Sequence, residues 1–106
     1  MSYKQMRLVL FFDLPMETVS QQRDYRNFMK KMKSQGFYMI QKSVYVKMGI
    51  DQQAADSAIA KVRTELPKDG NIFVLRVTEK QFAAMEFLLG DYSTDVINDD
   101  RRIIEL

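Results

Sequence analysis

The residue best suited to chemistry is Asp13, a carboxylate that directly follows the mostly apolar run Met6–Phe12. A run of this length and composition is typical of a buried strand, so Asp13 is expected at a strand end where its side chain meets solvent. The 106 residues include no His and no Cys. Imidazole bases, thiolate nucleophiles and zinc clusters are therefore excluded, and any chemistry must rely on carboxylates, hydroxyls, tyrosines and cations.

Asp13 admits two interpretations. An Asp followed by Leu14-Pro15 is most often a turn or capping residue, and one carboxylate alone is a poor Mg²⁺ site. A two-fold homodimer that brings two copies of Asp13 together would supply a pair, with water and phosphate completing the ligand shell of Mg²⁺ or Mn²⁺. An ion held there could activate water for cleavage of a phosphodiester bond.

A second group of residues is cationic and recurs at helical spacing; we call it the basic stripe, and it consists of Arg23, Arg26, Lys30 and Lys33. Such a stripe is by default the solvated face of an amphipathic helix. Asp24 is the only acid between its first and last members, and a dimer would double the stripe into a track for phosphates. The residues alone leave both interpretations open, a solvated helix face and a nucleic-acid-binding surface at these four residues.

Polar residues at Gln41 and Ser43 interrupt a segment that is otherwise rich in aromatic and β-branched residues. The simple interpretation is a bulge or tight turn whose side chains satisfy freed backbone groups. Ser43 has no evident base beside it, which argues against a nucleophile. We expect Gln41 and Ser43 to act as supporting residues that orient a metal-bound water near Asp13.

The first helix is predicted from Thr18 to about Gln35. Thr18 and Gln21 match a capping box, and Gly36 supplies a residue that tolerates a left-handed helix end. Its core-facing residues recur at positions i, i+3, i+4 and i+7, and they are Tyr25, Phe28, Met29 and Met32. The basic stripe then lies on the opposite side of this helix.

The remaining elements are predicted in chain order. Residues 37–48 form two short strands or one sharply bent strand, and a second helix runs from its cap at Asp51 to about Leu66. A turn at 67–71 precedes a strand at 72–77, a short helix extends to about Met85, and residues 87–89 form a small strand. This order favours an α+β fold, a ferredoxin-like βαββαβ sandwich with both helices on one face of the sheet.

Bulk properties indicate one ordered domain over residues 1–106, with a short leader at 1–5. Of the residues, 46% are hydrophobic and 28% are charged. No apolar stretch approaches the roughly 20 residues that span a bilayer, so we expect no membrane association and a cytoplasmic location. The net charge is only +2, but acids crowd residues 91–106. We expect this acidic tail to add an extra C-terminal edge strand, docked on a dimer partner or another protein.

The order of motifs resembles the Cas-two (Cas2) family of CRISPR-associated proteins. The resemblance rests on the strand ending in Asp13, an Arg near the next helix start (Arg23 or Arg26), Gly36, and the segment Gln41-Lys42-Ser43-Val44-Tyr45. These motifs span residues 6–48, and beyond them the match is mainly in size and element order. One departure is the leader, since the family usually begins almost at the first strand and Met6 is a candidate start.

The resemblance implies a ferredoxin-like homodimer that bridges Cas-one integrase subunits and binds double-stranded prespacer DNA during spacer acquisition. It also implies a Mg²⁺-dependent endonuclease acting on RNA or DNA, with Asp13 as metal ligand and catalytic residue. Two functions therefore compete: an adaptation scaffold with a dispensable nuclease, which we favour, and a protein whose main role is catalysis. An RNA-recognition sheet is disfavoured because the strand at 72–77 lacks the Gly-aromatic motif that stacks bases.

Overall fold

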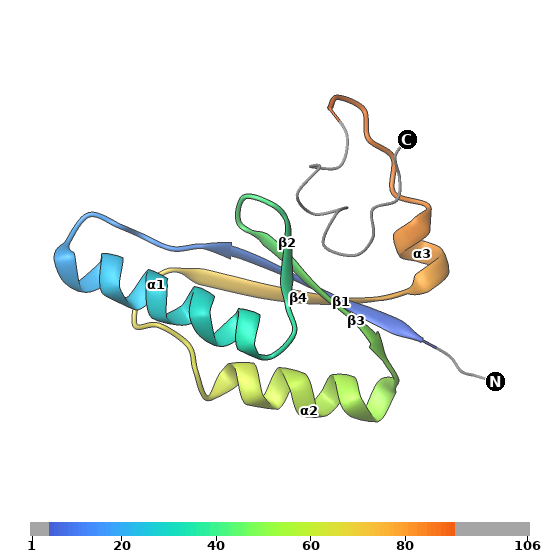
Figure 1. The fold of residues 1–106 in the computed structure, drawn as a ribbon, viewed down its shortest axis with the longest axis horizontal. Coiled ribbons are helices and arrows are strands. Elements are labelled where there is room, and N and C mark those ends of the chain that lie inside the picture. The colour runs from blue at the N-terminus through green and yellow to red at the C-terminus, as the bar shows by residue number, and fades with distance from the viewer. Residues whose placement is uncertain (1–4, 91–106) are drawn as a thin grey trace.

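The computed structural model describes residues 5–90, and these form a four-stranded antiparallel sheet with helices on both faces (Figure 1). The strands lie in the order β2-β3-β1-β4. Helices α1 and α2 cover one face, and the short α3 follows β4 at one end of the sheet. The elements are β1 (Met6–Asp13), α1 (Val19–Ser34), β2 (Tyr38–Gln41), β3 (Val44–Ile50), α2 (Gln52–Arg63), β4 (Asn71–Thr78) and α3 (Glu79–Ala83). The predicted ferredoxin-like βαββαβ fold is confirmed.

Each helix begins at a side chain that satisfies exposed backbone amides. The Thr18 hydroxyl accepts a hydrogen bond from the Gln21 backbone N–H at 3.0 Å, and the Gln21 side-chain oxygen accepts one from the Thr18 backbone N–H. Asp51 accepts from the backbone N–H of Ala54 at 2.8 Å. The predicted helix starts are therefore confirmed, because they depend on local chemistry that the sequence shows directly.

The core lies between the sheet and the two long helices. Leu8, Leu10 and Phe12 alternate along β1 and point toward the helices, and Leu8 and Leu10 are fully buried. The ring of Phe12 makes edge-on contacts with Tyr25, Phe28 and Tyr45. Buried Ala55 and Val62 of α2 complete this layer. Because the core residues take every second position of β1, Asp13 is turned to the opposite face.

The two alternatives for residues 37–48 resolve to two strands joined by a two-residue turn. Gln41 pairs with Val44, and Lys42 and Ser43 form the turn between them. Ser43 has a φ of 67°, a left-handed conformation that non-glycine residues adopt at a cost. The polar interruption in the sequence is therefore a hairpin tip.

The prediction of a small strand at 87–89 is wrong. These residues follow α3 without strand conformation, and Leu88 and Leu89 are 90% and 96% exposed. Residues 1–4 of the predicted leader and the acidic tail at 91–106, with its expected edge strand, lie outside the described residues. Within residues 5–90, no helix has the length and apolar character needed to cross a bilayer.

Arg7 fastens α3 to the face of the sheet that α1 and α2 leave uncovered. Its guanidinium donates to Glu79 at 2.7 Å and to the Tyr38 hydroxyl at 2.9 Å, and it lies 4.2 Å from the centre of the Phe82 ring. Burial opposes the charged form of Arg7. The interactions of Arg7 with the negatively charged Glu79 and with Tyr38 outweigh this effect and raise the pKa of Arg7. One side chain thus joins β1, β2 and α3.

A pH-dependent contribution to stability is expected from Tyr45. Burial, followed by the nearby Tyr25, raises the pKa of Tyr45 above its ordinary value of 10.0. Below that value Tyr45 is protonated in both states and its contribution is complete; above it the unfolded chain loses the proton first, so the free energy of unfolding falls. Between pH about 8 and about 11, the free energy of unfolding of Tyr45→Phe should therefore fall less than that of the unmodified protein. Urea unfolding at a series of pH values measures both. Parallel losses in the two proteins would contradict this.

Candidate active site and nucleic-acid surface

Asp13 lies at the last position of β1, beside the start of β4. Its Cα partner across the antiparallel ladder is Asn71, and both side chains are exposed. By strand alternation Asp13 shares a face with Phe11, opposite the face covered by α1 and α2. Gly70 permits this close approach: a Cβ at this position would lie 2.7 Å from the Asp13 carbonyl oxygen.

A hollow of about 290 Å³ opens beside Asp13, and its lining brings together Asp13, Gln41 and Ser43. We call it the Asp13 hollow; its lining is Phe11, Phe12, Asp13, Gln41, Lys42, Ser43, Val44, Asn71 and Phe73. The carboxylate therefore shares one concave surface with an ammonium, a hydroxyl and two amides. Gln41 and Ser43, predicted as supporting residues, lie at this hollow with Asp13.

The hairpin tip is held against β1 by a backbone hydrogen bond. The N–H of Phe12 donates to the carbonyl of Ser43 at 3.1 Å, one residue before Asp13. The left-handed conformation of Ser43 turns the chain so that Gln41 and Val44 can pair. Asp13 and Ser43 are 30 residues apart in the sequence, and the pairing of β1 with β3 brings them close together.

Oxygen atoms of these side chains match the chemistry of Mg²⁺, which prefers carboxylate, carbonyl and water oxygens. However, residues 5–90 contain no group of three or more His, Cys, Asp or Glu side chains that could hold a metal ion. The Asp13 hollow offers one carboxylate, with neutral oxygens from Gln41, Ser43 and Asn71 around it. One chain thus supplies a single carboxylate at this hollow, which is fewer charged ligands than Mg²⁺ usually takes from a protein site.

The basic stripe is a separate surface. All four of its members, Arg23, Arg26, Lys30 and Lys33, are exposed on α1, whereas Phe28, Met29 and Met32 of the same helix are buried. Because α1 covers the face of the sheet opposite Asp13, the stripe and the carboxylate do not belong to one site. The stripe has the solvent access that phosphate contacts require.

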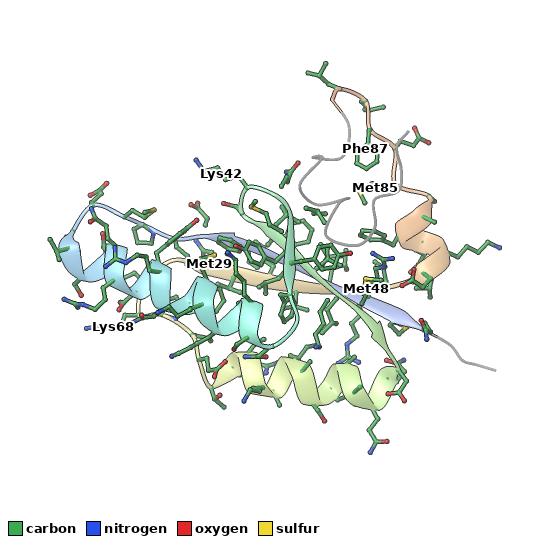
Figure 2. All side chains as sticks on the ribbon, viewed as in Figure 1. Met29, Lys42, Met48, Lys68, Met85 and Phe87 are labelled. Atoms are coloured by element: carbon green, nitrogen blue, oxygen red, sulfur yellow. The ribbon has the colours of Figure 1, made fainter. Side chains whose placement is uncertain are left out.

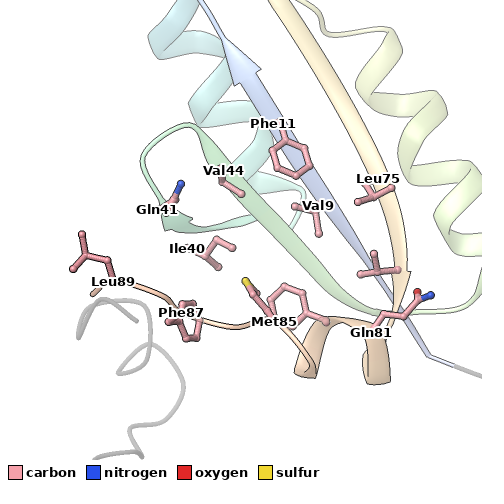
Figure 3. Close-up of a pocket in the computed structure, with 12 residues that line it drawn as sticks. Val9, Phe11, Ile40, Gln41, Val44, Leu75, Gln81, Met85, Phe87 and Leu89 are labelled. Carbon is pink, nitrogen blue, oxygen red and sulfur yellow. The ribbon is translucent and has the colours of Figure 1, made fainter. Parts of the chain in front are cut away.

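A larger hollow of about 510 Å³ lies on the sheet face opposite α1 and α2 (Figure 3). We call it the apolar hollow. It has no charged lining residue. Figure 3 shows side chains from the sheet facing those of α3 and the segment after it; they include Val9, Phe11, Leu75, Met85 and Phe87. Phe11, Gln41 and Val44 border both hollows. The composition of the apolar hollow suits packing against apolar groups. It offers no evident catalytic side chain.

Sequence reasoning missed Lys42 and Asn71 as members of the site. Asn71 enters because β4 pairs with β1 over its whole length, a neighbour relation that hydrophobic patterns do not specify. Lys42 lies between Gln41 and Ser43 and could have been found by treating the polar interruption as one turn.

Comparisons with known proteins identify the family of this chain. The family model for CRISPR associated protein Cas2 matches residues 6–85. Proteins described as CRISPR-associated endoribonuclease Cas2 include one from Streptococcus mutans, 44% identical over 101 residues that cover 95% of this chain and 93% of that protein. Another, from Treponema denticola, is 40% identical over 95% of this chain and all of its own length. With its ferredoxin-like sheet and the match over most of its length, the chain belongs to the CRISPR-associated Cas2 family.

Proposed function

We propose that this chain acts in CRISPR adaptation as a homodimer that binds double-stranded prespacer DNA and bridges Cas-one integrase subunits, and that it carries a metal-dependent endoribonuclease site at Asp13. The observation that carries the proposal is the separation of two surfaces: an exposed basic stripe on α1 and a polar hollow on the opposite face of the sheet. Each suits one of the two activities.

The basic stripe supports binding to the backbone of duplex DNA. Its cations are exposed and take no part in the ion pairs found within residues 5–90, which are Arg7–Glu79 and Arg76–Asp56. Phosphate contacts of this kind give affinity without sequence preference. That property suits a protein that must accept many different prespacers.

The Asp13 hollow supports cleavage of RNA, and the relatives named endoribonuclease favour that substrate over DNA. Asp13 would hold Mg²⁺ or Mn²⁺, which when bound supplies an activated water and stabilises charge on the phosphate. Gln41, Ser43 and Asn71 would orient water and the ribose or phosphate oxygens by hydrogen bonds. The name endoribonuclease that these relatives carry is the specific finding that keeps catalysis beside the scaffold role as a second candidate.

The sheet face opposite α1 and α2 supports a second copy of the chain as the partner. Large apolar side chains are exposed there, with Phe73 at 67% and Leu75 at 52% exposure. An apolar surface bordering a hollow of this size marks an interaction site. Since Asp13 lies on the same face, a two-fold contact there would bring two copies of Asp13 toward each other.

Leu75→Glu tests this arrangement. A charge buried without a partner at the interface should weaken association by about 3 kcal/mol or more, a factor above about 100. We expect sedimentation to give a dimer for the unmodified protein and a monomer for Leu75→Glu, with Mg²⁺-dependent RNA cleavage lost along with the dimer. The matched control is Leu66→Glu, because Leu66 is 51% exposed and lies between α2 and β4.

The control should remain dimeric and active. A monomeric unmodified protein, or a Leu75→Glu variant that stays dimeric, would remove the basis for a paired Asp13 site. Integrase bridging is tested separately, by co-purification of the dimer with Cas-one subunits and a prespacer duplex.

A further inference from the structure

The tip of the β2–β3 hairpin carries Lys42, a cation that the proposed function leaves without a role. Its side chain is exposed, and Figure 2 shows it at the turn between the two strands. Lys42 also lines the Asp13 hollow. Of the nine residues around that hollow, Asp13 and Lys42 are the two that carry charge at neutral pH.

The backbone fixes Lys42 close to the end of β1. The turn has only two residues, and the pair Gln41–Val44 closes it. The carbonyl of Ser43 accepts the N–H of Phe12 at 3.1 Å, which ties the turn to the residue before Asp13. The ammonium of Lys42 is thus attached to a short, anchored turn, and little conformational freedom of the backbone is lost when a ligand binds.

The charge of Lys42 is available to a ligand. Within the part of the chain that the structure describes, Lys42 forms no ion pair, whereas Arg7 and Arg76 are paired with Glu79 and Asp56. In particular, no ion pair joins Lys42 to Asp13, although both lie at one hollow. Both residues line the hollow, and neither charge is neutralised by the other.

While no metal ion is bound, a phosphodiester in the Asp13 hollow needs a compensating cation from the protein. The carboxylate of Asp13 repels a phosphate at close range, and in a partly enclosed site this repulsion is screened less than in bulk water. Lys42 is the lining residue that can offset it, since the other polar members, Gln41, Ser43 and Asn71, are neutral. An ammonium is a strong phosphate ligand that binds as a point charge.

We propose that Lys42 is a substrate-binding residue of the Asp13 hollow, where its ammonium contacts a phosphate of a single RNA strand. This inference rests on the proposed endoribonuclease function, which it extends by a binding contact. Because the contact exists before and during the reaction, its loss raises KM more than it lowers kcat. It also removes one phosphate contact from the salt dependence of binding.

The test compares Lys42→Gln with a matched control, Lys80→Gln. Lys80 is also exposed, but it lies on α3, which follows the end of β4 remote from Asn71 and Asp13. Binding of a fluorescent single-stranded RNA is measured in EDTA, so that no strand is cut, over a series of KCl concentrations. Cleavage of the same RNA in Mg²⁺ gives KM and kcat.

For Lys42→Gln we expect about tenfold weaker binding at low salt, a salt slope reduced by about 0.7, and a similar rise in KM. Lys42→Arg keeps the charge and should restore binding, and Lys80→Gln should behave as the unmodified protein. The proposal is overturned if Lys42→Gln and Lys80→Gln bind alike, if only kcat changes, or if the unmodified protein does not bind RNA.

The two proposals fail in different ways. If the unmodified protein binds RNA through Lys42 but does not cut it in Mg²⁺, the nuclease function falls and the phosphate contact stands. If the protein cuts RNA and Lys42→Gln changes neither binding nor KM, the nuclease function stands and the role of Lys42 falls.

Discussion

Replacing Asp13 with Asn is expected to reduce Mg²⁺-dependent RNA cleavage by more than about 100-fold, which exceeds the usual effect of removing a group that only supports a metal ligand. The change preserves side-chain size and one oxygen but removes the negative charge, and in a dimer it removes two. Product formation by the purified protein, with Mg²⁺ and with a chelator, measures the effect.

The variant should keep its fold, its dimer and its affinity for duplex DNA, because Asp13 is exposed and outside the core. Asp56→Asn is the matched control: Asp56 is an exposed carboxylate on α2, and its ion pair with Arg76 lies at the surface, where such pairs contribute little. Cleavage that persists in Asp13→Asn would remove Asp13 from the catalytic site. Spacer acquisition that survives in cells with this variant would assign the protein a scaffold role.

Neutralising the whole basic stripe, by Arg23→Gln, Arg26→Gln, Lys30→Gln and Lys33→Gln together, should weaken binding of duplex DNA by at least about 100-fold at moderate salt. If all four residues contact phosphates, the slope of log K against log salt falls in magnitude by about 3.6 for each protomer. Gln has a helix propensity close to those of Lys and Arg, so α1 should persist. Fluorescence anisotropy with a labelled duplex over a salt series gives both quantities.

A variant of equal charge change serves as control, with Gln at four exposed cations away from the stripe: Lys61, Arg63, Lys68 and Lys80. It should retain most of the affinity and the salt slope. RNA cleavage at the Asp13 hollow should survive in the stripe variant, because the stripe lies on the other face of the sheet. Equal losses of DNA affinity in the two variants would indicate a response to net charge alone.

The elements that the sequence predicts best are those with local signals. Thr18 with Gln21, and Asp51, define helix starts by hydrogen bonds within four residues, and the structure has both; α3 begins in the same way at Thr78 with Gln81. The predicted strand at 87–89 failed for the opposite reason. Its apolar residues satisfy a propensity, but no strand partner is present for them within residues 5–90.

The candidate site was predictable only in part. Asp13 stood out because a carboxylate interrupts an apolar run, and Gln41 and Ser43 because polar residues interrupt another. Their meeting in one hollow depends on β1 lying between β3 and β4, and this order is a property of the whole sheet. Asn71 became part of the site through that order, so no feature of its own neighbourhood in the sequence could indicate it.

The exposure of Asp13 affects which evolutionary pressures can retain an aspartate at this position. Within residues 5–90 its side chain makes no ion pair and no hydrogen bond, while its neighbour Phe12 is 5% exposed and contacts three other aromatic rings. Natural selection acting through stability holds position 12, because a smaller residue there leaves a cavity. Selection for stability has little effect on the residue at position 13. Among living descendants of a common ancestor, a retained aspartate at that position therefore records demand for its charge, and a lineage that no longer uses the charge is free to drift there.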